Sequence, residues 1–167
     1  MYMRSTTRPT EKPSDLPLFA LGAFDVPSLN PKTGVIDLSY RATNLSPEGM
    51  WGIALDYDDV PNETLVGILN RAREFSPRGV AYSTWSQGLG PADTGRVRIV
   101  MPFGESERGS VVPASAWPVV WALIEQDIGG HADAQCKDVN RTYYLPVTNE
   151  QAPEWAQPCW FESWGSE

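Results

Sequence analysis

The chain has few of the residues that metal–thiolate and histidine chemistry need, with two cysteines and one histidine among 167 residues. Cys136 and Cys159 do not form a CxxC pair, and no histidine stands near them at metal-ligand spacing. This pattern argues against a structural zinc site. Thiols without a pairing pattern are typical of a reducing compartment, so we expect a cytoplasmic protein.

Long apolar runs are also missing from the sequence. No stretch approaches the roughly 18 apolar residues of a membrane span, and residues 1–9 lack the apolar segment of a signal peptide. We therefore expect no membrane partner. With 41% hydrophobic and 20% charged residues, the chain is expected to fold, and its length suits a single domain.

Positive charge is scarce, because 13 Lys and Arg face 21 Asp and Glu and the net charge is -8. This argues against broad binding to a phosphate backbone, although a local basic groove stays open as an alternative. Seven Trp and fifteen Pro are both high numbers. The tryptophans indicate core packing or, alternatively, a surface that stacks on bases or binds a protein partner.

The order of apolar patterns predicts an α/β fold of the α+β kind, with helices packed on an open mixed sheet. We expect a lead-in over residues 1–15, one domain over 16–150 and a Trp/Pro/Glu-rich tail over 151–167. The predicted strands cover residues 35–40, 51–55, 79–84, 97–102 and 143–146.

Two helices are expected within this domain. Pro61 opens the first, and its apolar face carries Leu65, Ile68 and Leu69. Ser115 is expected to cap the second, which runs from Ala116 to about Ile128 and ends at Gly129-Gly130. Its expected apolar face consists of Val119, Val120, Leu123 and Ile124.

An acidic motif directly follows the predicted strand 51–55. Alternation along an extended chain places Asp56 and Asp58 on one side. Neighbouring carboxylates repel each other unless a cation lies between them, and Mg²⁺ or Mn²⁺ prefers such oxygen ligands. The motif therefore indicates a metal site or, alternatively, a solvated acidic turn.

Two further segments carry polar residues of interest. Hydroxyl groups of Ser83 and Thr84 end one strand, and Arg96 and Arg98 share one face of the next, where they suit phosphate contacts or an ordinary solvent face. The segment 133–146 brings another carboxylate and two cations, which are Asp133, Lys137 and Arg141, or else forms a polar loop.

Taken in this order, the segments resemble the primase-like (prim-pol) catalytic domain of the archaeo-eukaryotic primase superfamily, in the form found in plasmid and phage replication proteins. The resemblance covers residues 50–147. The matching segments are the apolar strand with its Asp-x-Asp pair at 53–58, the Tyr-Ser-Thr strand at 82–86, the Arg-x-Arg strand at 96–102, and Asp133 with Arg141 and Tyr-Leu-Pro at 144–146.

The resemblance implies a palm-like sheet, a metal-dependent DNA primase or polymerase activity, and nucleoside triphosphates and single-stranded nucleic acid as partners. It assigns Mg²⁺ or Mn²⁺, and with it catalysis, to Asp56, Asp58 and Asp133. Nucleotide binding is assigned to Ser83, Thr84, Arg96, Arg98, Lys137 and Arg141.

One departure from the family pattern bears on activity. The second family motif carries histidine where this chain has Trp85 and Gln87, and the single histidine, His131, stands in a Gly-Gly-His-Ala-Asp segment. Three interpretations follow: a primer-synthesising nucleotidyltransferase, a degenerate relative that binds nucleic acid, nucleotide or protein without catalysis, and a metal-dependent nuclease using the same acids.

Overall fold

The computed structural model describes residues 18–23, 32–34, 48–104, 111–146 and 161–165. The predicted strand 35–40 and the lead-in 1–15 lie outside the described residues. Within them, no helix is both long and apolar enough to cross a membrane.

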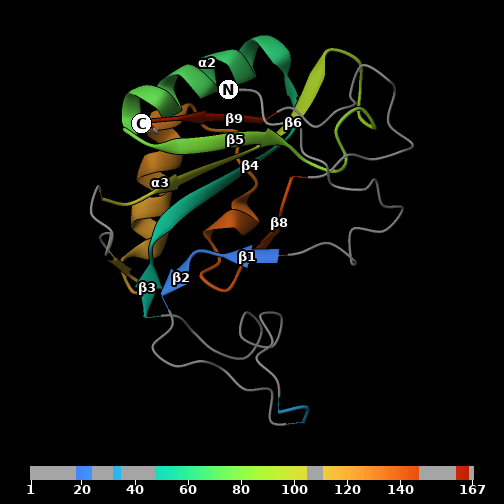
Figure 1. Cartoon of the computed structure of the whole chain (residues 1–167). Helices are drawn as coiled ribbons and strands as arrows, with labels where there is room; N and C mark the ends of the chain where they lie inside the picture. Colours follow the sequence, from blue (N-terminus) through green and yellow to red (C-terminus); the bar gives the residue numbers. More distant parts are fainter. Residues whose placement is uncertain (1–17, 24–31, 35–47, 105–110, 147–160, 166–167) are drawn as a thin grey trace.

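The main sheet has four strands in the order β4-β6-β5-β9 (Figure 1). Its strands are β4 (Gly52–Pro61), β5 (Gly79–Ser83), β6 (Thr94–Pro102) and β9 (Phe161–Trp164). Each neighbouring pair is antiparallel. β4 and β5 run parallel to each other with β6 inserted between them. The α+β class is thus confirmed, while the expected mixed sheet is wrong at the level of strand pairs, because β6 separates the two parallel strands.

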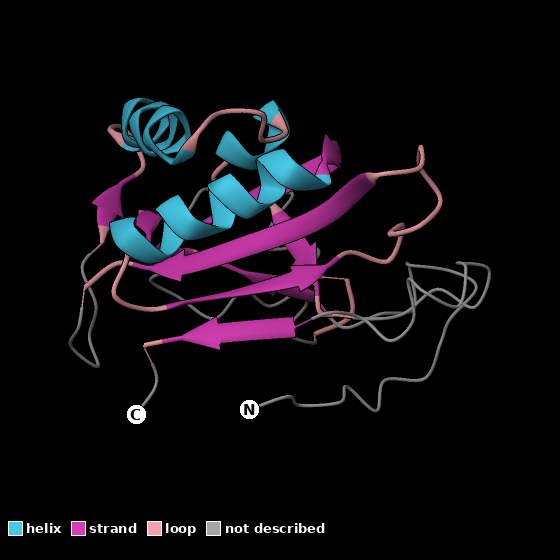
Figure 2. Cartoon of the chain, turned by 90° about the horizontal axis from the view of Figure 1, so that it is seen from above, coloured by secondary structure: helices cyan, strands magenta, loops and turns pink. Residues whose placement is uncertain are grey.

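Both long helices cover the same face of this sheet (Figure 2). α2 (Asn62–Phe75) connects β4 to β5 and buries Leu65, Ile68 and Ala72. Leu65 and Ile68 are confirmed as core residues, and Leu69 packs against the core from a half-buried position. The helix begins one residue after Pro61, whose fixed φ suits the entry to a helix.

α3 (Trp117–Ile128) exists as expected, but its buried face matches the prediction only in part: Ile124 is buried and Val120 packs half-buried against the core, as expected. Its buried side chains are Trp117, Trp121, Ile124 and Ile128. Val119 and Leu123, predicted for the core, are 64% and 62% exposed. The helix is apolar on several sides, and burying two indole rings removes more apolar surface from water than burying valine and leucine.

The start of α3 also differs from the prediction. Ala116 is the N-cap residue, and no side chain caps the helix, so Ser115 does not have the expected role. The amide of Ala116 instead donates to the carbonyl of Pro113 in a preceding turn. At the other end Gly129 has φ 130° and Gly130 φ 74°, conformations that glycine adopts readily, so the predicted stop is confirmed.

The remaining elements are short. They are β1 (Leu18–Ala20), β2 (Gly22–Ala23), β3 (Gly49–Met50), β7 (Val112–Pro113), the 3₁₀ helix η2 (Ala134–Lys137) and β8 (Thr142–Tyr144). Two of them, η2 and β8, belong to the third polar segment. β8 pairs with β1 and overlaps the predicted strand 143–146, but it begins one residue earlier and ends at Tyr144. The amide of Asp133 donates to the carbonyl of Asp56 at 2.8 Å and so fixes η2 beside β4.

Candidate functional site

The three polar segments meet in one pocket of about 220 Å³. The pocket lies on the face of the sheet that points away from the helices. Asp56 and Asp58 belong to this face, whereas Tyr57 between them points to the other face and is fully buried in the core. Its lining residues are Asp56, Asp58, Tyr82, Thr84, Trp85, Ser86, Arg98, Asp133, Arg141, Tyr144 and Leu145. Segments far apart in the sequence therefore form a single hollow.

A buried ion pair forms part of the wall of this pocket. Asp56 and Arg98 face each other across β4 and β6 in the strand register. Nε of Arg98 donates to Oδ1 of Asp56 at 2.5 Å, and its second guanidinium nitrogen donates to Oδ2 at 2.7 Å. The side chains are only 10% and 8% exposed. Such a two-point contact orients both groups and neutralises the carboxylate charge.

Further contacts hold the guanidinium of Arg98 in place. Its remaining terminal nitrogen donates to the carbonyl of Tyr144 at 3.0 Å, and the hydroxyl of Tyr82 donates to that carbonyl at 2.9 Å. The guanidinium carbon lies 5.8 Å from the ring centre of Tyr82 and 5.0 Å from that of Tyr143. These distances are those of cation–π contacts. Arg98 therefore links β4, β5, β6 and β8 at one point.

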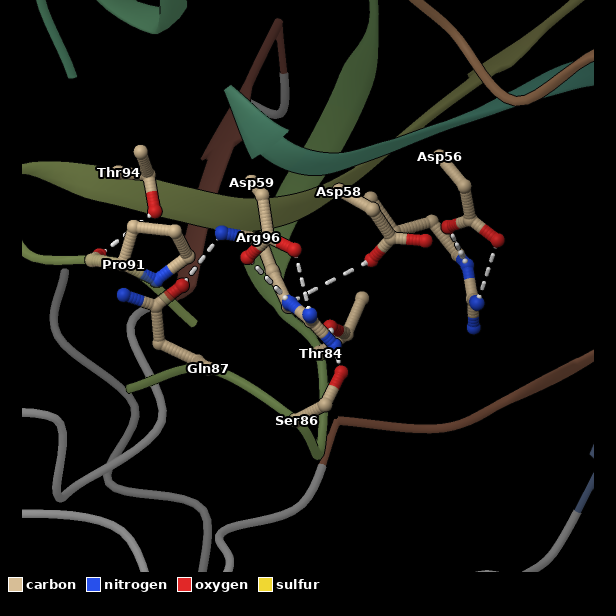
Figure 3. A network of polar contacts seen from close by, with 10 residues as sticks. Asp56, Asp58, Asp59, Thr84, Ser86, Gln87, Pro91, Thr94 and Arg96 are labelled. Atoms are coloured by element: carbon tan, nitrogen blue, oxygen red, sulfur yellow. Dashed lines mark hydrogen bonds and ion pairs between the residues drawn. The ribbon is translucent and has the colours of Figure 1, made fainter. Parts of the chain in front are cut away.

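β4 does not end before the acidic residues, as the sequence predicted, but continues through them. Its pairing with β6 is interrupted between Tyr57 and Val60 by a bulge, where Asp59 adopts φ 55°. A bulge adds residues to one strand and redirects their side chains. Asp58 and Asp59 thereby both turn towards Arg96, which Figure 3 shows next to them.

Arg96 forms a second arginine–aspartate ion pair beside that of Arg98 with Asp56. It contacts both carboxylate oxygens of Asp59, at 2.8 and 2.6 Å, and its Nε lies 4.0 Å from Oδ1 of Asp58. Gly90 comes so close to Asp59 that an added Cβ would stand 1.9 Å from Oδ1. Arg96 shares a face of β6 with Arg98, as predicted, yet it is outside the pocket lining.

Asp58 is the carboxylate most open to solvent in the pocket, with a side chain 56% exposed. Partial burial is the largest cause of a raised pKa at Asp58, and Arg96 works against it. The carboxylates of Asp56, Asp59 and Asp133 raise this pKa further. Repulsion among like charges of this kind favours the binding of either a proton or a metal cation.

The raised pKa of Asp58, caused by burial and then by the neighbouring carboxylates, predicts a pH-dependent effect of Asp58→Asn. A raised pKa means that the folded state binds the proton more tightly, so the associated stability is present below the ordinary value of 3.8 and is lost as the pH rises through the folded-state pKa. We expect Asp58→Asn to raise the melting temperature at pH 7, and the gain in free energy of unfolding to be less than about 1 kcal/mol because the group is exposed. Melting curves at pH 7 and pH 3 check this: a gain of equal size at both pH values contradicts it.

The third segment adds a carboxylate and a cation at the edge of the pocket. Asp133 is the N-cap residue of η2, where its side chain accepts a hydrogen bond from the amide of Gln135 at 3.0 Å. Arg141 lies 3.6 Å from Oδ2 of Asp133 and donates to the side chain of Gln135 at 2.6 Å. Lys137, at the end of η2, is exposed and does not line the pocket.

The structure thus brings together most of the predicted site residues. Asp56, Asp58 and Asp133 line the pocket, as do three of the predicted nucleotide-binding residues, Thr84, Arg98 and Arg141. Ser83, Arg96 and Lys137 do not line it. Ser83 belongs to the opposite face of β5 from Tyr82, because neighbouring residues of a strand point to opposite sides.

Several lining residues were not predicted from the sequence, namely Tyr82, Ser86, Tyr144 and Leu145. All four belong to the motif segments 82–86 and 144–146, which is the signal in the sequence that could have found them. Asp59, the partner of Arg96, directly follows Asp58 in the sequence but was assigned no role from it. Its position depends on the bulge in β4.

Trp85 and Gln87, which stand where the primase-like pattern that the sequence resembles has histidine, have different surroundings. Trp85 lines the pocket. The side-chain oxygen of Gln87 instead accepts a hydrogen bond from the amide of Arg96 at 2.5 Å, and the amide of Thr84 donates to the carbonyl of Arg96 at 2.9 Å. Gln87 therefore ties the loop after β5 to β6, and Trp85 contributes an aromatic wall to the pocket.

The tryptophans divide between core and surface. Trp117 and Trp121 are buried, which agrees with core packing. Trp51 and Trp164 line a second, more apolar hollow of about 530 Å³ with Leu21, Val80 and Val100. Trp51 is 41% exposed.

Whether a divalent cation fits this site depends on how far the carboxylates of Asp56, Asp58 and Asp133 are already bonded to arginines. Oxygen ligands of this kind suit Mg²⁺ and Mn²⁺. In the part of the chain that the structure describes, however, no three His, Cys, Asp or Glu side chains form a group that could hold a metal ion as they stand. Asp56 is paired with Arg98, and Arg141 lies near Asp133, so Asp58 offers the most open carboxylate.

Comparison of the chain with protein-family models, with curated proteins and with solved structures finds no match.

Proposed function

We propose that the chain is a primase-like domain that binds a nucleoside triphosphate with a divalent cation and transfers nucleotides to the 3′-hydroxyl of a growing primer on single-stranded nucleic acid, with release of pyrophosphate, in a plasmid or phage replication system. The observation that carries the proposal is the convergence of Asp56, Asp58 and Asp133 in one pocket with Arg98 and Arg141. These residues come from the segments on which the resemblance rests, although they are separated by up to 85 positions in the sequence.

The charges of the pocket support a ligand that brings its own cation. Three carboxylates against two guanidinium groups leave the lining with one net negative charge. A triphosphate alone is repelled by such a lining, while its complex with Mg²⁺ or Mn²⁺ is much less negative. We therefore expect nucleotide binding to require a divalent cation.

The lining residues would divide into those that bind the cation and those that bind the phosphates. Asp58, with Asp56 and Asp133, would hold the cation, and Arg98 and Arg141 would contact phosphate oxygens. When bound, the cation would stabilise the charge on the phosphates during the transfer. Trp85 and Tyr144 provide aromatic surfaces beside these groups, which suit contact with a base.

The test is the incorporation of labelled nucleotides on a single-stranded template with Mn²⁺. We expect Asp133→Asn to abolish incorporation, while Asp138→Asn, an equal change of charge at an exposed position in the same segment, leaves it intact. Asparagine is as good a helix cap as aspartate, so the turn at residue 133 is retained. No incorporation by the wild type with Mg²⁺ or Mn²⁺ would remove the enzymatic proposal.

A second candidate function is a degenerate primase-like module that binds nucleotide, nucleic acid or protein without catalysis. It is favoured by Trp85 at the family's histidine position and by the arginines that lie within 4.0 Å of all three carboxylates. Binding of nucleotide without incorporation would support this candidate over the first.

Replacing Trp85 by histidine separates the two candidates further. An indole offers one N–H donor and no charge, whereas a protonated imidazole offers two donors. We expect Trp85→His to strengthen triphosphate binding by about 1–2 kcal/mol, the size of a charge-assisted hydrogen bond. Calorimetric titration of Trp85→His beside Trp85→Phe checks this: equal affinities of the two variants would show that position 85 does not contact the phosphates.

A further inference from the structure

Both oxygens of the Asp56 carboxylate are already occupied by Arg98. The contacts are 2.5 and 2.7 Å long, and they are shielded from solvent, with side chains 8% and 10% exposed. A cation approaching Asp56 therefore meets a guanidinium at bonding distance. At low solvent exposure, the repulsion between these positive charges is only weakly screened.

Arg98 itself lines the pocket and faces the space in which a phosphate would lie. The carbonyl of Tyr144 holds one of its nitrogens, and the rings of Tyr82 and Tyr143 flank it. These contacts keep the guanidinium in the wall even when its bonds to Asp56 are weakened. A phosphate oxygen would compete with Asp56 for the same N–H donors.

We propose that Arg98 couples the binding of cation and phosphate in this pocket. Its hydrogen bonds prevent a cation from binding to the Asp56 carboxylate until a phosphate group accepts some of these hydrogen bonds instead. Arg98 is thus a positioning residue as well as a phosphate contact. This inference rests on the proposed function. It adds that the two halves of the ligand, the divalent cation and the phosphate group, each bind weakly when the other is absent.

The physical consequence is a reciprocal coupling between two ligands. The phosphate releases Asp56 for the cation, and the cation at Asp56 releases Arg98 for the phosphate. Linkage requires both effects to have the same size, and couplings of this kind typically amount to about 5–150-fold in affinity. Breaking the pair by mutation should then strengthen the binding of each half of the ligand by itself.

The phosphate half is tested with inorganic triphosphate in EDTA, so that no cation takes part. Asp56→Asn and Asp58→Asn each remove one negative charge from the same strand and the same pocket, but only Asp56 is bonded to Arg98. We expect Asp56→Asn to bind triphosphate about tenfold more tightly than Asp58→Asn. Equal affinities would mean that only net charge matters and would overturn the proposal.

The cation half is tested with Mn²⁺ alone, by the paramagnetic signal of the free ion. We expect Arg98→Gln to bind Mn²⁺ about tenfold more tightly than Arg78→Gln, which removes an equal charge at an exposed position outside this pocket. Equal Mn²⁺ affinities of the two variants would overturn the proposal. If Arg98→Gln does not fold, the comparison of Asp56→Asn with Asp58→Asn decides alone.

These outcomes are distinguishable from a failure of the proposed function. If the wild type binds dATP with Mn²⁺ but the matched variants do not differ, the coupling by Arg98 is wrong and the nucleotide site stands. If no form of the protein binds dATP, triphosphate or Mn²⁺, the proposed function and the coupling both fail.

Discussion

Arg98→Gln is expected to lower the free energy of unfolding by about 3–5 kcal/mol, since it leaves the buried carboxylate of Asp56 without its partner. The loss should also include the hydrogen bond to Tyr144 and the contacts with the two flanking tyrosine rings. Unfolding in urea, followed by circular dichroism, measures the change.

Two further variants show that the loss comes from the pair. The double change Asp56→Asn with Arg98→Gln should cost less than the sum of the two single changes, because no buried charge is left unpaired. Arg96→Gln, the same substitution two residues away on the same face of β6, should cost much less because its contact with Asp59 is more exposed. Additive single effects would contradict a coupled pair.

The second large effect concerns ligand binding at Asp58. We expect Asp58→Ala to weaken the binding of dATP with Mn²⁺ by about a hundredfold or more, because this carboxylate is the most open of the three and the one most available to a cation. The protein itself should remain folded, since the side chain is largely exposed. Calorimetry at pH 7 with matched metal concentration gives the ratio.

Asp127→Ala is the matched control for this experiment. Asp127 is exposed on α3 and does not line the pocket, so Asp127→Ala removes the same charge outside the pocket. It should bind dATP with Mn²⁺ as the wild type does. A similar loss in both variants would indicate a general effect of net charge, and an unchanged affinity of Asp58→Ala would exclude Asp58 from the cation site.

Local sequence patterns anticipated much of the scaffold. Alternation correctly placed Asp56 and Asp58 on one side of a strand, and Arg96 and Arg98 on one face of another, because side-chain direction in a strand is set by the backbone. Pro61 gave the start of α2 to within one residue, and Gly129-Gly130 gave the end of α3, since proline and glycine act locally.

The pairing of these residues could not be read in the same way. Whether Arg98 lies opposite Asp56 depends on the register between β4 and β6, which are separated by α2 and β5. The bulge after Tyr57 then directs Asp59 to Arg96, and no short pattern predicts it. For this reason the acids were predicted as open metal ligands, whereas the structure pairs Asp56 with an arginine.

The face of α3 illustrates a second limit. The predicted Ile124 is buried, but Trp117 and Trp121 lie at helical spacing from it just as the exposed Val119 and Leu123 do from each other, so periodicity alone gives two possible apolar faces. The choice between them depends on which side chains fill the space above the sheet. That is a matter of tertiary packing, which a pattern of apolar residues does not contain.

The most direct measurement of the central claim is a calorimetric titration of the wild-type protein with dATP, once with Mn²⁺ and once with EDTA. The net negative lining of the pocket predicts saturable binding with Mn²⁺ and at least about a tenfold weaker affinity in EDTA. Equal affinity under both conditions, or no binding with Mn²⁺, would contradict a site for a nucleotide and a divalent cation.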